Sequence, residues 1–324
     1  MENKFERPEG NDYVVPFVLH GTSLRGRLVR LSESVNGILT KHKYPEPVSK
    51  LLGELLVLTA MLGATLKYQG VFTMQLKSDG PVRFMVADYT SEGHLRGYVS
   101  LDEEVFNIEK NIMPDAPMDF LALLGKGYLA ITVDQGEEME RYQGIVELRG
   151  RTLVDAVQEY FHRSEQLEVL LVTAIGKEMT EQKSGRRKRS WHAGGLMLQR
   201  MPEEGGNTEI RLDKKISPED REEGWRRARI LGGSVKYEEL LDWTLPPDTL
   251  LYRLFHEDGV WVYNVKEVAA KCRCSRKRIA SVLGSMKREE VESMKVRGKI
   301  TVTCQFCNSK EIFSSEQIEK LFQA

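Results

Sequence analysis

Cysteine, long apolar runs and signatures of catalysis are all scarce in this 324-residue chain. The longest uncharged apolar run covers residues 55–66, only 12 residues, whereas about 20 are needed to cross a bilayer. The first ten residues alternate in charge and contain no apolar core, so they do not predict a secretory signal. We therefore expect no contact with a membrane and a cytoplasmic location.

No motif indicates an enzyme. The segment from Gly125 to Gly127 lacks the G-x-x-x-x-G-K-[ST] frame that surrounds phosphates and is interpreted as a turn. The six histidines show no H-E-x-x-H spacing, and no G-x-S-x-G elbow is present to expose a serine nucleophile. His256 precedes Glu257 in a predicted helix, where we expect it to form local hydrogen bonds. The chain is not expected to be an enzyme.

A net charge of −1 conceals an uneven distribution. Residues 251–324 hold 14 Lys/Arg against 9 Asp/Glu, a net of +5, which leaves 33 against 39, a net of −6, in residues 1–250. The chain is 41% apolar and 8% aromatic, which is enough for a substantial core. An acidic body with a basic tail indicates a protein of two parts.

The four cysteines are confined to the last 53 residues. Cys272 and Cys274 form a C-x-C pair, 29 residues follow, and Cys304 and Cys307 form a C-x-x-C pair. Two close pairs at this separation can bring four sulfurs to the corners of a tetrahedron, as a structural Zn²⁺ site requires. The alternative is four buried cysteines packing as small apolar residues, but those would be scattered over the core. The spacing therefore predicts one Zn²⁺ bound by these four cysteines.

Basic residues crowd the first cysteine pair. Nearby cations favour the thiolate, lower the pKa of the sulfur and make it more reactive. They also offset the formal charge of about −2 of a zinc ion with four thiolates. Such a site can be purely structural, or it can be oxidised and release its metal. The residues that form this cluster are Lys271, Arg273, Arg276, Lys277 and Arg278.

The body of the chain is predicted to be an α+β domain built on a mostly antiparallel sheet with segregated helices. Apolar periodicity predicts helices over residues 28–39, 48–62 and 152–165. The long apolar stripe of the second helix is interpreted as core rather than a binding groove. Strands are predicted over residues 13–19, 72–76, 82–87, 95–101, 128–133, 142–148, 168–175 and 196–201.

A charged linker is predicted to join the body to a small C-terminal module. Residues 202–224 are rich in acids and poor in apolar groups, so this segment gains little from ordering. Ser217 and Pro218 indicate a helix start, and Gly232 and Gly233 its end; we expect this helix to be marginally stable. Further short helices are predicted over residues 235–243 and 247–256, and a strand over 260–263. The predicted domains are 1–201, the linker 202–250, and a zinc module 251–324.

The zinc module has clear helix starts but little material for a core. Ser275 is expected to cap a helix that reaches Leu283, and Ser314 with Gln317 forms a capping-box pattern. Residues 300–304 alternate as a strand that leads into the second cysteine pair. A module of roughly 70 residues usually needs a staple such as a metal ion.

The cysteine pattern at the end of a chain of this length resembles the redox-regulated 33-kDa heat-shock chaperones of bacteria. The resemblance extends over roughly residues 12–324, which is far more than one motif. Segments similar to those characteristic of that family occur in order at residues 70–83, 95–98, 141–147, 160–166, 193–199 and 252–257.

The resemblance implies a holdase that needs no ATP. In that family oxidation forms disulfides within the close pairs, here Cys272–Cys274 and Cys304–Cys307, and zinc is released. The zinc module and linker then lose structure, unfolding client proteins bind, and the chaperone forms a homodimer. One departure is Glu311, at a position where the family commonly has an aromatic residue.

Two other functions are possible. A zinc-ribbon nucleic-acid-binding protein would use the basic runs from Lys271 to Arg278 and from Lys183 to Arg189. A body of net charge −6 and a pI near 6.6 argue against it, and the second run, which lacks interleaved aromatics, is interpreted as a solvated hairpin loop. A thiol-oxidoreductase would place its C-x-x-C motif near the first helix of a βαβ unit rather than beside a second metal-ligand pair.

Overall fold

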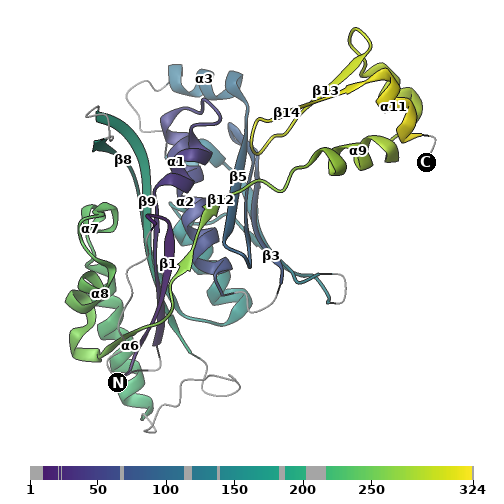
Figure 1. Cartoon of the computed structure of the whole chain (residues 1–324). Coiled ribbons are helices and arrows are strands. Elements are labelled where there is room, and N and C mark those ends of the chain that lie inside the picture. Colours follow the sequence, from purple (N-terminus) through teal and green to yellow (C-terminus); the bar gives the residue numbers. More distant parts are fainter. Residues whose placement is uncertain are drawn as a thin grey trace. The chain divides into compact units, whose positions relative to one another are not determined.

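The computed structural model describes residues 10–20, 22, 24–65, 69–112, 119–136, 139–181, 187–201 and 217–322. The chain divides into two compact units, residues 1–270 and 271–324, which are treated separately (Figure 1). Within the described ranges, no helix combines the length and the apolar character needed to cross a membrane.

The first unit contains two six-stranded sheets. In one sheet the order is β10-β1-β2-β9-β8, with β11 also paired to β1, and every pair is antiparallel. Its strands are β1 (Tyr13–Leu19), β2 (Leu24–Leu31), β8 (Val169–Glu181), β9 (Arg187–Arg200), β10 (Val260–Val262) and β11 (Lys266–Glu267).

The second sheet has the order β12-β5-β4-β3-β6-β7, and only the pair β12–β5 is parallel. Its strands are β3 (Val71–Ser78), β4 (Val82–Thr90), β5 (His94–Leu101), β6 (Gly127–Asp134), β7 (Tyr142–Glu147) and β12 (Ala269–Ala270). Two short helices, α3 (Glu103–Ile112) and α4 (Phe120–Leu124), follow β5. The predicted α+β class with antiparallel sheets is confirmed.

Helix α2 (Glu46–Gly63) lies between the two sheets (Figure 1). Fourteen of its 18 residues are buried, and the apolar ones among them belong to the larger apolar core. A helix that is apolar on nearly all sides belongs in an interior, not in a groove. The interpretation of this stripe as core is confirmed.

One predicted helix is partly wrong. Residues 28–31 were expected to open a helix, but they end β2, and helix α1 begins only at Glu33 and runs to Leu39. Leu28 and Leu31 have helical spacing, yet β2 is covered on both faces, so its side chains are buried regardless of alternation. A strand buried on both faces loses the period of two by which a strand is recognised.

The helix predicted over residues 152–165 is present in two parts. Helix α5 (Leu153–Tyr160) begins with a capping box between Thr152 and Asp155 and continues as a π-helical turn, η1 (Phe161–Glu165). Tyr142 and Tyr160 both donate to the Glu165 carboxylate, which ties this turn to β7.

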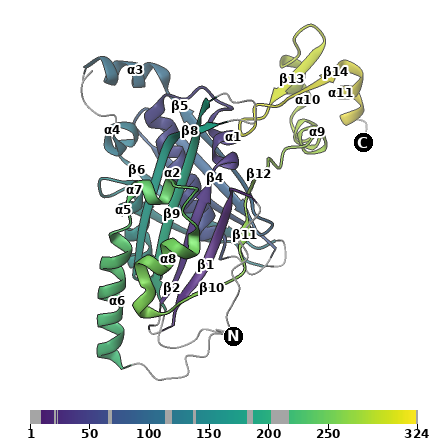
Figure 2. The ribbon, with the colours of Figure 1, turned by 60° about the vertical axis from the view of Figure 1, so that its left-hand side comes forward.

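Three helices cover the outer face of the first sheet (Figure 2). They are α6 (Pro218–Gly233), α7 (Tyr237–Leu241) and α8 (Pro247–Phe255), followed by the short η2 (His256–Asp258). Ser217 caps α6 by accepting from the Asp220 N–H, as predicted, and Pro218 occupies its first position. The acidic part of the predicted linker, residues 202–216, lies outside the described residues.

The second unit is small. Strands β13 (Lys299–Thr303) and β14 (Lys310–Ser314) form a hairpin beside α9 (Arg276–Ser285), α10 (Arg288–Ser293) and α11 (Ser315–Leu321). The caps at Ser275 and Ser314 are as predicted, although α9 runs two residues past Leu283. Its core consists of five buried residues, Leu283, Val291, Ile300, Phe313 and Ile318.

Candidate metal centre

The first cysteine pair lies in an irregular segment and the second in a hydrogen-bonded turn. Cys272 and Cys274 precede α9, and the Cys274 N–H donates to the Cys272 sulfur at 3.4 Å. Cys304 and Cys307 lie in the turn between β13 and β14, where the Asn308 N–H donates to the Cys304 carbonyl at 2.8 Å. Asn308 has a φ of 57°, in the left-handed region that asparagine tolerates better than most residues. These two segments direct four sulfurs inward.

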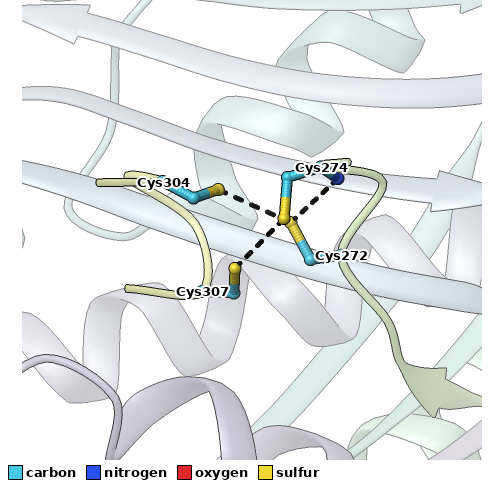
Figure 3. A group of neighbouring side chains, drawn as sticks. All are labelled: Cys272, Cys274, Cys304 and Cys307. Carbon is cyan, nitrogen blue, oxygen red and sulfur yellow. Dashed lines mark hydrogen bonds between the residues drawn. The ribbon is translucent and has the colours of Figure 1, made fainter. Parts of the chain in front are cut away.

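The four predicted cysteine side chains come together, with all four sulfurs within 4.8 Å of one another (Figure 3). The Cys272 and Cys304 sulfurs are 3.7 Å apart, and those of Cys274 and Cys307 are 3.3 Å apart. A tetrahedral site with metal–sulfur bonds of about 2.3 Å has sulfur–sulfur edges of about 3.8 Å. The donor set therefore fits one metal ion of the tetrahedral thiolate type.

Burial and mutual repulsion oppose four thiolates at these separations. Burial raises the pKa of Cys274 to about 12, as do hydrogen bonds shared with the other three sulfurs. Burial likewise raises the pKa of Cys304, against hydrogen bonds from the backbone of Cys307 and Phe306. Four thiolates cannot be held this close without a positive charge among them. A bound cation would supply that charge.

Ser309 adjoins the cysteine cluster and was missed by the sequence reasoning. Its hydroxyl lies 3.0 Å from the Cys307 sulfur and 3.7 Å from the Cys274 sulfur. Burial raises the pKa of Cys307, but the Ser309 hydroxyl and N–H and the neighbouring sulfurs outweigh it and lower the pKa to about 6. The sequence feature that could have identified Ser309 is its hydroxyl side chain two positions after the last cysteine.

Arg276 and Glu311 connect the two halves of the unit. The Arg276 guanidinium donates to the Glu311 carboxylate at 2.7 Å, to the Ile312 carbonyl at 2.8 Å and to the Gln317 side chain at 2.9 Å. It also lies over the Phe313 ring, 4.3 Å from the centroid. Glu311, found where an aromatic residue was expected, thus pairs with one of the basic residues near the first cysteine pair.

The other basic run is only partly described. Lys183 and Arg186 lie outside the described residues, and the side chains of Arg187 and Lys188 are likewise not described. Arg189 lies in β9. Where the structure describes possible metal ligands, the cysteine cluster is the one group of three or more with suitable geometry.

Comparisons with known proteins agree on one family. The family model described as Hsp33 protein matches residues 12–314. A 33 kDa chaperonin of Caulobacter vibrioides is 38% identical over 301 residues, covering 92% of this chain and 93% of the relative. A 33 kDa chaperonin of Pseudomonas fluorescens is 35% identical over 313 residues, covering 96% of this chain and 93% of the relative.

A solved structure has the same fold. The crystal structure of a 33 kDa chaperonin from Thermotoga maritima superposes with a TM-score of 0.72 at 24% identity. The match covers 97% of this chain and 98% of that one.

Proposed function

The chain belongs to the Hsp33 chaperone family, and from this premise we propose that it is a redox-regulated holdase that binds unfolding proteins under oxidative stress without ATP. The observation that carries the proposal is the convergence of four sulfurs in a unit too small to be stable without a staple.

In the resting, reduced state Cys272, Cys274, Cys304 and Cys307 hold one Zn²⁺. The sulfur separations and the hydrogen bonds from Ser309 and the backbone support this assignment. The ion supplies the cross-link that a core of five buried residues does not. Because a structural site of this kind binds metal only when folded, its binding energy is folding energy.

Oxidation is the switch. Two thiolates give up one electron each and form a disulfide, and the electron pair reduces an oxidant such as hydrogen peroxide to water. A disulfide sulfur is no longer an anionic ligand, so the metal is lost and the unit unfolds. The proposed disulfides are Cys272–Cys274 and Cys304–Cys307, which peptide mapping by mass spectrometry under non-reducing conditions would identify.

The proposed clamp is the linker over residues 202–250, and within it α6 buries few large side chains. The buried residues of α6 are Gly224, Trp225, Ala228 and Gly232, so Trp225 is its one large buried side chain, assisted by the partly buried Leu231 and the ion pair of Arg227 with Asp258. A cavity of about 270 Å³ lies where Trp225 and Arg229 of α6 face α5 and η1. These features support a segment that detaches at low cost.

Polar contacts fasten the rest of the clamp to the sheet. Arg30, fully buried in β2, donates to the carbonyls of Leu245 at 2.6 Å and Glu239 at 3.1 Å. The Trp243 indole N–H donates to His192 Nδ1 in β9. Beneath these helices the sheet presents an apolar face that would bind unfolded clients once exposed, formed by Tyr13, Val15, Phe17, Leu19, Leu24, Leu28, Ala174, Leu196 and Leu198.

The remaining parts of the proposal follow from the same switch. A reducing cytoplasm keeps the cysteines able to bind metal until stress occurs. The exposed apolar face would also favour a homodimer in the active state, which light scattering after gel filtration would detect.

The test compares zinc-loaded reduced protein with peroxide-treated protein in one client-aggregation assay, with zinc release and far-UV circular dichroism followed in parallel. We expect release of one zinc per chain, loss of helical signal, and suppression of aggregation only after oxidation. Equal suppression by both forms would contradict redox control, and suppression by neither would contradict the holdase.

A further inference from the structure

Three basic side chains gather on the inner face of the first sheet, close to the C-terminal end of α2. Arg25 and Arg27 are two residues apart on β2, so they share a face. In the strand register Arg27 is opposite Pro16 of β1, and Lys266 of β11 is opposite Val14, two residues along the same strand. Lys266 and Arg27 therefore lie on the same face of the sheet, one on each side of β1 and two residues apart in register.

Arg27 is the unusual member of the group. Its side chain is 8% exposed, and its hydrogen-bond partner is the Met197 sulfur at 3.6 Å. Within the described ranges, no carboxylate lies within ion-pair distance of its guanidinium. Burial, together with the charge of Arg25, lowers the pKa of Arg27 to about 9. A thioether is a weak acceptor and does not compensate a buried guanidinium.

The other two cations also have neutral partners. Arg25 donates to the Gln199 side-chain oxygen at 2.9 Å, and burial lowers its pKa. Lys266 donates to the Ala64 carbonyl at 2.7 Å; burial lowers its pKa, and the charge of Arg27 lowers it further. The hydrogen bond from Lys266 to the C-terminal end of α2 accounts for the position of Lys266, because a cation is favourable at that end of a helix. It does not explain why a second and a third cation stand beside it.

We propose that Arg25, Arg27 and Lys266 form an anion site that takes a phosphate group. Arg27 is the buried member of the group, and Lys266 on β11 is the exposed one, from which an anion in solvent would be reached first. A phosphate has enough oxygens and charge to accept hydrogen bonds from an arginine guanidinium and from a lysine ammonium at the same time. A chloride ion satisfies only one donor direction at a time.

The site lies in the first unit and uses neither the cysteines nor the helices α6–α8. It is therefore independent of the chaperone proposal, and each can fail without the other.

The test uses the full-length, zinc-loaded, reduced protein. Inorganic phosphate and pyrophosphate are titrated against sodium chloride of equal ionic strength, with binding measured by calorimetry and thermal melting. We expect saturable binding of pyrophosphate that weakens at least about tenfold in Arg27→Gln and in Lys266→Gln, since each loses a charge-assisted hydrogen bond. Lys77→Gln, at an exposed lysine on β3, is the control and should bind within about twofold of the parent.

Several outcomes would overturn the proposal. They are a melting shift that chloride reproduces, binding that is not saturable, or equal pyrophosphate affinity in the parent and Lys266→Gln. Lys266 decides the matter if Arg27→Gln fails to fold, because it lies on the surface. A further expectation is that Arg27→Gln without ligand melts no lower than the parent, since it removes an uncompensated buried charge.

Discussion

Replacing Trp225 with alanine should release the clamp without any oxidant. Trp225 is 3% exposed and is the one large side chain that α6 buries against the outer face of the first sheet. The larger core between the two sheets does not contain it. The substitution therefore weakens docking of α6 while leaving the platform beneath intact.

The magnitude follows from the burial. Truncating a fully buried tryptophan costs about 3 to 5 kcal/mol, which corresponds to about two to three and a half powers of ten in the docking equilibrium. The remaining buried residues of α6 are two glycines and an alanine, which offer little compensation. A clamp that is docked in nearly all molecules of the parent would be undocked in a substantial fraction of the variant.

The assay is suppression of client aggregation by reduced, zinc-loaded protein, with limited proteolysis to report whether α6 is accessible. We expect Trp225→Ala to suppress aggregation in the reduced state and to be cleaved within residues 218–233. The control is Ile230→Ala on the same helix, where the side chain is 66% exposed and its loss should change neither result. A Trp225→Ala protein that is cleaved in α6 yet remains inactive would refute the assignment of the covered face as the client surface.

Three further predictions test other parts of the molecule. Ser309→Ala should weaken zinc binding about 10- to 100-fold in a chelator competition, because the Cys307 sulfur loses its hydroxyl partner. The control is Ser293→Ala, which should leave zinc binding unchanged because the Ser293 hydroxyl bonds within its own helix. Arg276→Ala should destabilise the second unit by about 1 to 2 kcal/mol, measured as zinc release in urea, because it removes the contacts to Glu311, Gln317 and Phe313. The control is Lys277→Ala, at an exposed neighbouring residue, and an equal loss of stability in that variant would contradict the reasoning. Burial raises the pKa of Glu54 from 4.5 to about 7 despite its bond from Thr173, so the folded state binds this proton more tightly than the unfolded chain does. The stability that this proton contributes is lost as the pH rises from about 4.5 through 7. Glu54→Gln should therefore raise the free energy of unfolding at pH 8 by at most about 3 kcal/mol, measured as a higher melting temperature, and leave the melting temperature unchanged near pH 4.5.

The cluster of four cysteines could be predicted from the sequence because its determinants are local. Two cysteine pairs, each within a few consecutive residues, fix the candidate donor set before any tertiary contact is known. The helix caps at Ser217, Ser275 and Ser314 were predictable for the same reason, since a cap depends on three or four consecutive residues.

Features set by distant residues could not be predicted. Strand β2 was partly taken for helix because α2 covers one of its faces and the helices α6–α8 cover the other, and those neighbours are defined only in the folded chain. The second apolar core likewise depends on residues near 15, 196 and 250 meeting across the sheet. The cationic group of Arg27 and Lys266 joins positions 239 residues apart, a separation that no periodicity can report.

The short strands β11 and β12 have a further consequence for association. They immediately precede Cys272, and within the first unit they lie against two different edges, β11 against β1 and β12 against β5. Each contributes only two residues, so β5 and the half of β1 that β10 does not cover are shielded by very few backbone hydrogen bonds. If this stretch came away, β1 and β5 would each present unpaired N–H and C=O groups, the kind of template along which an extended foreign chain can add itself as a new strand.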